Sequence, residues 1–131
     1  MKVEDLMIED WLLYKSDSLE NAFPIQITRE MFNKELVVWN DRFEPIPLTP
    51  EILNKNGFVN SYIDLSLNKD SVYKHNHFYT GNSVIVDMES NKLIVKYEND
   101  IWMNLPYSRT IYVHELQHVL KHCDIKKEII I

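Results

Sequence analysis

The chain has 131 residues, of which 45% are hydrophobic and 11% aromatic, and its formal net charge at pH 7 is -6. This length suits one domain with its own core, and the composition excludes an intrinsically disordered segment. The acidic balance argues against free nucleic acid as a ligand, because binding to phosphates requires clustered lysine and arginine. An acidic surface instead suits a basic protein partner.

The first part of the chain, residues 1–48, predicts the β-rich half of a single domain that spans residues 1–131. Residues 2–8 can form a helical turn. β-branched and aromatic runs bounded by Asn, Asp and Pro then indicate three strands. The strands are expected at residues 10–15, 24–29 and 35–43. Together they predict a small curled antiparallel sheet.

A short central helix is predicted within residues 49–57. Thr49 can cap its N-terminus, Pro50 suits the first helical position, and Gly57 suits the left-handed residue after its end. We therefore expect the helix itself at about residues 50–56. It would connect the first sheet to a second one.

Residues 58–105 predict a β-meander, because short runs of mostly alternating character are separated by turn sequences rich in Asn, Asp and Ser. Four strands are expected, at residues 61–67, 83–89, 92–98 and 100–105.

The closing helix is expected from residue 108 to residue 123, with Ser108 or Thr110 as its cap. At 100° per residue its apolar positions gather on one side, which packs on the sheet. Val113, Leu116 and Leu120 lie along that side, with Tyr112, Val119 and Cys123 beside them. Residues 126–131 then add an edge strand or pack as a tail. The fold class is therefore α+β.

Inside this helix, His114-Glu115-Leu116-Gln117-His118 matches the H-E-x-x-H pattern of zinc peptidases. On a helix the two histidines lie one turn apart and could share a tetrahedral ion, while Glu115 could activate a bound water. A small zinc-dependent metallopeptidase is therefore one candidate function.

A catalytic zinc also requires a third protein ligand, normally placed after a glycine turn or on a later helix. Here Asp124 stands ten residues after the first histidine, no glycine lies between, and Glu128 is too close for a separate helix. His122 lies on the same helical face, but ~12 Å away by helical rise. We therefore expect no catalytic residue and no zinc or other cofactor. Any incidental metal ion would bind at His114 and His118.

The side of the helix opposite the apolar stripe carries His114, Glu115, His118 and His122. Because packing of the apolar stripe turns the opposite side outward, these four residues are predicted to be exposed. They form the candidate binding surface.

Other candidate sites carry weaker signals. His75 and His77 lie on the same side of a strand or in a loop and could bind a metal, although solvated histidines are commoner. Trp11, Trp39 and Trp102 lie within apolar strands and are predicted to anchor the core. A single cysteine, at position 123, excludes an internal disulfide and a cysteine-based zinc cage and suits a reducing compartment. We expect this cysteine to be a small core residue.

The sequence carries no signal peptide and no apolar stretch approaching the ~20 residues that span a bilayer. We therefore expect a cytoplasmic protein that contacts no membrane.

Three segments, EDLMIEDWLLY, EPIPLTPEILNKNGF and YVHELQ, resemble a group of small proteins encoded by phages, prophages and mobile elements of Bacteroidota. In that group the last helix often reads Val-His-Gln-Leu-Gln-Asn. Val113, His114, Leu116 and Gln117 match that pattern, whereas Glu115 and His118 depart from it. The proline-rich segment is the most specific part of the resemblance.

The resemblance implies an accessory protein of a phage, acting without catalysis by binding a host protein. Proteins of that description include inhibitors of defence systems, the anti-CRISPR proteins, and the RNA-guided RNase of type VI systems is one such target. We therefore expect an inhibitor of an RNA-guided nuclease or its ribonucleoprotein. The alternatives are the zinc metallopeptidase and a virion or replication accessory protein.

Overall fold

The computed structural model describes residues 6–15, 22–33, 42–60, 72–76, 82–99, 101–125 and 127–131. Two small antiparallel sheets and a few helices, among them a C-terminal one, form an α+β fold, as the sequence predicts. Neither sheet is closed. None of the described helices is long and apolar enough to cross a bilayer.

The N-terminal sheet has three strands, and its central strand is β1 (Trp11–Lys15). β1 is antiparallel to β2 (Ala22–Gln26) on one side and to β3 (Phe43–Pro45) on the other. Leu12 of β1, for example, lies opposite Ile25 of β2. The predicted first sheet is therefore present.

The boundaries of this sheet differ from the prediction. β2 ends earlier than expected: Ile27 still pairs with the chain before β1, where its N–H donates to Asp10 O (2.9 Å), and the chain then turns into a short helix, α1 (Arg29–Asn33). The sequence did not indicate α1. Of the strand predicted at 35–43, residues 35–41 lie outside the described residues, and Phe43 begins β3.

The second sheet is the predicted meander, with five strands that follow one another in chain order. They are β4 (Val59–Asn60), β5 (Val72–Asn76), β6 (Ser83–Asp87), β7 (Lys92–Lys96) and β8 (Trp102–Pro106). The strand predicted at 61–67 lies outside the described residues. β5 occupies a segment for which the sequence left strand and loop open.

The central helix α3 (Pro50–Lys55) is present as predicted, with the predicted cap at its start and glycine after its end. Thr49 Oγ1 accepts the N–H of Ile52 (3.2 Å), which satisfies one of the free donors at the helix start. Gly57 has φ 82°, the left-handed conformation that costs glycine little.

The C-terminal helix α4 (Val113–His122) starts later than predicted, and neither Ser108 nor Thr110 caps it. The residues before it run alongside the segment that precedes α3, where Leu48 N–H donates to Ile111 O (2.8 Å). This pairing holds the chain extended up to the start of the helix.

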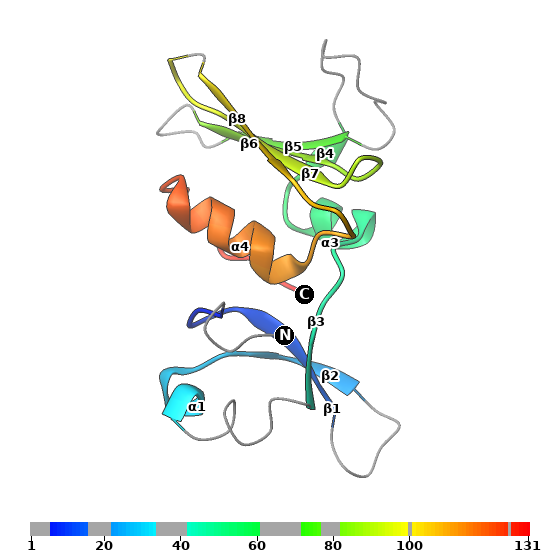
Figure 1. The fold of residues 1–131 in the computed structure, drawn as a ribbon, viewed down its shortest axis with the longest axis vertical. Helices are drawn as coiled ribbons and strands as arrows, with labels where there is room; N and C mark the ends of the chain where they lie inside the picture. Colours follow the sequence, from blue (N-terminus) through cyan, green and yellow to red (C-terminus); the bar gives the residue numbers. More distant parts are fainter. Residues whose placement is uncertain are drawn as a thin grey trace.

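α4 lies between the two sheets, with the five-stranded sheet on one side and the three-stranded sheet on the other (Figure 1). Its apolar side packs on the five-stranded sheet as predicted, through Val113, Leu116 and Leu120. The strands contribute Val84, Val86, Leu93 and Val95 to this core. Each of these fully buried side chains stabilises the fold by ~2 kcal/mol through removal of apolar surface from water.

A second, smaller core belongs to the three-stranded sheet and α1. It consists of Leu6, Leu12, Ile27, Met31 and Phe43. Because successive residues of a strand face opposite sides, Leu12 joins this core while Trp11 and Leu13 face the main one.

The tryptophans share no single role. Trp11 packs partly buried against the main core, as predicted. Trp102 is 38% exposed, so its predicted role as a core anchor is wrong. It lies on the edge strand β8, where Met103 and Leu105 face the core and Trp102 faces away from it. Trp39 lies outside the described residues.

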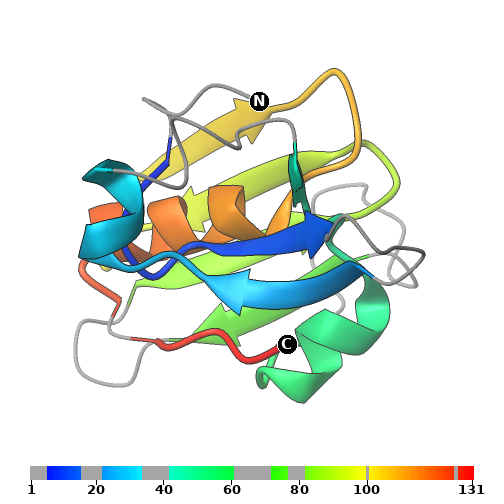
Figure 2. The same ribbon diagram turned by 90° about the horizontal axis from the view of Figure 1, so that it is seen from below.

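The chain end packs as a tail and forms no strand in its described residues, 127–131. The buried amide of Asn56 holds it: Nδ2 donates to Ile130 O (2.7 Å) and Oδ1 accepts from Ile130 N (2.6 Å). Trp11 Nε1 donates to Ile129 O (2.7 Å). The tail therefore connects α3 to β1, and Figure 2 shows it beside α3.

We predict that Asn56→Ala lowers the free energy of unfolding by about 1–3 kcal/mol, because it removes the two hydrogen bonds that the buried Asn56 amide makes to the backbone of Ile130. Chemical denaturation measures the change. Asn54→Ala, at an exposed position of the same helix, is the control and should change stability by less than ~0.5 kcal/mol. Equal effects of both substitutions would contradict the role of Asn56.

Candidate functional site

A tight turn just before β1 presents backbone carbonyls to α4. Asp10 N–H donates to Met7 O (3.2 Å), and Glu9 has φ 76°, an uncommon conformation for a residue other than glycine. Glu9 N–H donates to Ile27 O (2.8 Å), which ties the turn to the chain after β2. The carbonyls of Ile8 and Glu9 are left to accept from side chains.

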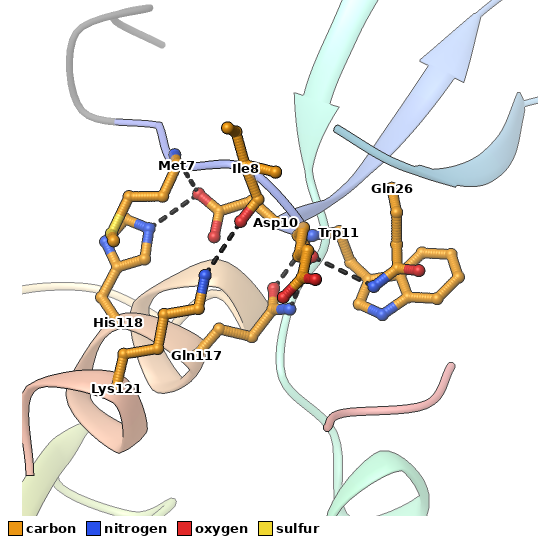
Figure 3. A network of polar contacts seen from close by, with 9 residues as sticks. Met7, Ile8, Asp10, Trp11, Gln26, Gln117, His118 and Lys121 are labelled. Carbon is orange, nitrogen blue, oxygen red and sulfur yellow. Dashed lines mark hydrogen bonds and ion pairs between the residues drawn. The ribbon is translucent and has the colours of Figure 1, made fainter. Parts of the chain in front are cut away.

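Three side chains of α4 bind this turn, and two of them, Gln117 and Lys121, bind its backbone (Figure 3). Gln117 Oε1 accepts the N–H of Trp11 (2.9 Å), and its Nε2 donates to Glu9 O (2.9 Å). One turn of helix later, Lys121 Nζ donates to Ile8 O (2.9 Å). The amide of Gln26 on β2 also donates to Glu9 O (3.2 Å). We call the contacts between the 7–11 turn and Gln117, His118 and Lys121 the polar seam.

Asp10 lies at the centre of the polar seam and is fully buried. Its Oδ2 accepts from Met7 N–H (2.8 Å) and lies 2.7 Å from His118 Nε2. A carboxylate oxygen accepts, so the hydrogen of His118 is on Nε2. This contact fixes both the orientation and the tautomer of the His118 ring.

His114 is buried rather than outward, which corrects the predicted exposure of this residue. Its ring stacks on that of Tyr112 (5.9 Å between centroids) and meets that of His118 edge to face (5.6 Å). The physical reason is that the three-stranded sheet and its leading turn cover this side of α4. His114 Nδ1 has no hydrogen-bond partner among the described residues.

Burial lowers the pKa of His114 below its ordinary value of 6.5. His118 and Arg109 act in the same direction, whereas Asp10 and Glu115 oppose it. The ring is therefore neutral near pH 7, which suits a buried imidazole.

Glu115 has a structural role at the start of α4. Its Oε1 accepts the N–H of Tyr112 (2.8 Å), as in a capping box. Both carboxylate oxygens also bind Arg109, at 2.7 and 3.0 Å. The Arg109 guanidinium in turn lies over the Tyr112 ring, 4.4 Å from its centroid.

The residues of the H-E-x-x-H motif are therefore oriented by contacts within the fold. His118 binds Asp10, Glu115 binds Arg109, and His114 stacks on Tyr112. Over the part of the chain that the structure describes, no three of its His, Cys, Asp and Glu residues are grouped so that they could hold a metal ion. The donor set does not fit a zinc centre with three protein ligands.

A groove of about 580 Å³ opens beside the polar seam. It lies between α4 and the inward-facing residues of β8, and its lining is mainly apolar. The lining residues are Met7, Met103, Leu105, Tyr107, Glu115, His118, Val119, Lys121, His122 and Cys123. Three of the four predicted surface residues, Glu115, His118 and His122, thus border the groove, and His114 does not.

Two of the remaining candidates are placed only in part. His75 lies in β5, and His77 lies outside the described residues.

Cys123 is buried, as predicted, and burial raises the pKa of its thiol. It is therefore a core residue at the bottom of the groove and no nucleophile at neutral pH.

Sequence reasoning missed Asp10, Gln117 and the two groove methionines, Met7 and Met103. Asp10 and Gln117 carried no local signal, because their partners lie 108 and 106 positions away in the sequence. The methionines carried none, since the contact between residue 7 and α4 depends on the tertiary fold.

Comparisons with protein-family models, with curated proteins and with solved structures found no match to this chain.

The pKa of His114 predicts how stability depends on pH. Because the folded-state pKa lies below 6.5, the unfolded chain takes up the proton first, and stability falls as pH falls from 6.5 toward the folded-state pKa. His114→Gln should remove up to ~1.4 kcal/mol per pH unit of this dependence. Denaturant unfolding at several values between about pH 7 and about pH 5 measures it. If the free energy of unfolding depended on pH in the same way in the wild type and in His114→Gln, the pKa of His114 would not change on folding.

Proposed function

We propose that this protein acts without catalysis by binding another protein in the groove between α4 and β8. The groove itself is the observation that carries this proposal. Its size and apolar lining suit the side chains of a partner, and its two methionines are flexible enough to fit varied shapes. The exposed side chains of Met7 and Ile8 on its N-terminal side add apolar surface that a partner would cover.

Charge favours a basic partner. The chain carries a net charge of -6, and the cationic side chains around the groove already contact groups of the fold. Lys121 binds a backbone carbonyl, and Arg109 binds Glu115. A basic protein would be attracted from a distance, with association that weakens as salt rises.

The partner class that we propose is an RNA-guided nuclease of a bacterial defence system, with the RNase of type VI systems as the first candidate. Support comes from the sequence resemblance to phage-encoded proteins and from the acidic charge. A nucleic-acid channel is lined by Lys and Arg, so its rim is a basic surface that an acidic protein can cover.

The test is an RNA-cleavage assay with a purified type VI RNase, its guide RNA and a target RNA. We expect the protein to slow cleavage and to elute with the RNase in gel filtration. Met7→Glu places a charge in the groove while keeping the backbone contact of Met7 with Asp10, and should abolish both effects. Val59→Glu is the matched control, since Val59 is 62% exposed on β4, at the other rim of the same sheet.

Three outcomes would contradict the proposal in whole or in part. Equal inhibition by the wild type and by Met7→Glu would exclude the groove as the contact. Hydrolysis of a protein substrate by the purified chain, dependent on added zinc and lost in His118→Ala, would establish the metallopeptidase instead. No effect on the RNase, with binding to a virion or replication protein, would reassign the partner class.

A further inference from the structure

The outer edge of β8 is available for pairing with another strand. β8 is the last strand of the five-stranded sheet and pairs with β7 alone among the described residues. Figure 2 shows β8, in gold, at the rim of that sheet. An edge strand presents backbone N–H and C=O groups that another extended chain can bind.

The hydrogen bonds to β7 show which groups of β8 face outward. Tyr97 N–H donates to Ile101 O (2.8 Å) and Tyr107 N–H donates to Asn91 O (2.9 Å), so positions 101 and 107 face β7. In an antiparallel pair this direction alternates along the strand. The N–H and C=O groups of Trp102 and Asn104 therefore point to the free edge.

Pro106 agrees with this pattern. Pro106 is opposite Lys92 of β7, at a position where a backbone N–H would point to the free edge. Because proline has no N–H, it removes no hydrogen bond to β7 here. The free edge thus offers two donors, at Trp102 and Asn104, with their carbonyls and that of Pro106.

Apolar surface lies on both faces of this edge. On the side of α4, Met103 and Leu105 line the groove. On the opposite side, Trp102 is 38% exposed. A strand added to β8 would place alternate side chains in the groove and the others beside the Trp102 ring.

We propose that the partner is held by strand addition: an extended segment of a basic protein pairs with the free edge of β8 and inserts every second side chain into the groove. This inference rests on the proposed binding function and adds the way in which the partner is held. The fitting segment has apolar residues at alternate positions and lysine or arginine near them, because the chain that receives it has a net charge of -6.

A second copy of the chain could also pair with this edge. Its charge opposes that arrangement, since two chains of -6 repel each other, whereas a basic segment is attracted. The isolated protein should therefore sediment as a monomer.

The test uses a displayed library of random peptides selected on the wild-type protein. Binding peptides should show apolar residues at every second position together with lysine or arginine. Asn104→Pro removes one outward N–H without removing a bond to β7 and should weaken their binding by about tenfold or more. Asn104→Ala keeps the N–H and should bind as the wild type does. Thermal unfolding checks that both variants fold.

A second measurement does not depend on the fold of a variant. The amides of the selected peptide fall into two alternating sets, of which only one would face β8. N-methylation of that set should abolish binding, whereas N-methylation of the other set should leave binding nearly unchanged. Strand addition would be overturned if both sets of N-methylated peptides bound equally well, or if the peptides bound Asn104→Pro as tightly as the wild type. It would also be overturned if no peptide were selected, or if the free protein formed a dimer that Asn104→Pro dissociates. If Met7→Glu abolishes RNase inhibition while Asn104→Pro does not, the groove function stands and strand addition alone fails.

Discussion

The buried carboxylate of Asp10 holds the turn that joins the N-terminal sheet to α4. A carboxylate removed from water requires hydrogen-bond donors, and Met7 N–H and the His118 ring supply them to one of its oxygens. The same turn presents Glu9 O to Gln117. The three-stranded sheet is thus attached to α4 through specific polar contacts, with Trp11 and Leu13 adding apolar contact beside them. The other side of α4 packs on the five-stranded sheet through apolar residues. One helix of ten residues therefore carries a different kind of interface on each side.

This arrangement explains why a zinc-peptidase pattern can occur here in a structural role. His118 fastens the turn through Asp10, and Glu115 caps its own helix and binds Arg109. His114 is a neutral ring packed on Tyr112. The second interface of α4 is polar, and His118 and Glu115 make hydrogen bonds there to groups of the fold. The binding surface that we propose is the groove, which Glu115 and His118 border, together with the free edge of β8.

Local signals in the sequence predicted local structure well. Thr49, Pro50 and Gly57 located α3, and the spacing of Val113, Leu116 and Leu120 identified the side of α4 that packs on the meander. The start of α4 was misplaced, since Ser108 and Thr110 carry a capping signal that a distant pairing of Leu48 with Ile111 overrides. The exposure of His114 was also mispredicted, because hydrophobic periodicity assumes one packed side and α4 has two. The role of Asp10 requires contact between residues 108 positions apart, which no local pattern contains.

The central claim is that the polar seam attaches the N-terminal sheet to α4. Native-state hydrogen exchange resolved by residue tests it most directly, with the wild type compared to a Gln117→Ala, His118→Ala variant. We predict that the amides of β1, that of Trp11 above all, exchange faster in the variant, while those of β6 and β7 keep their protection. Unchanged exchange at β1, or an equal increase in both sheets, would contradict it.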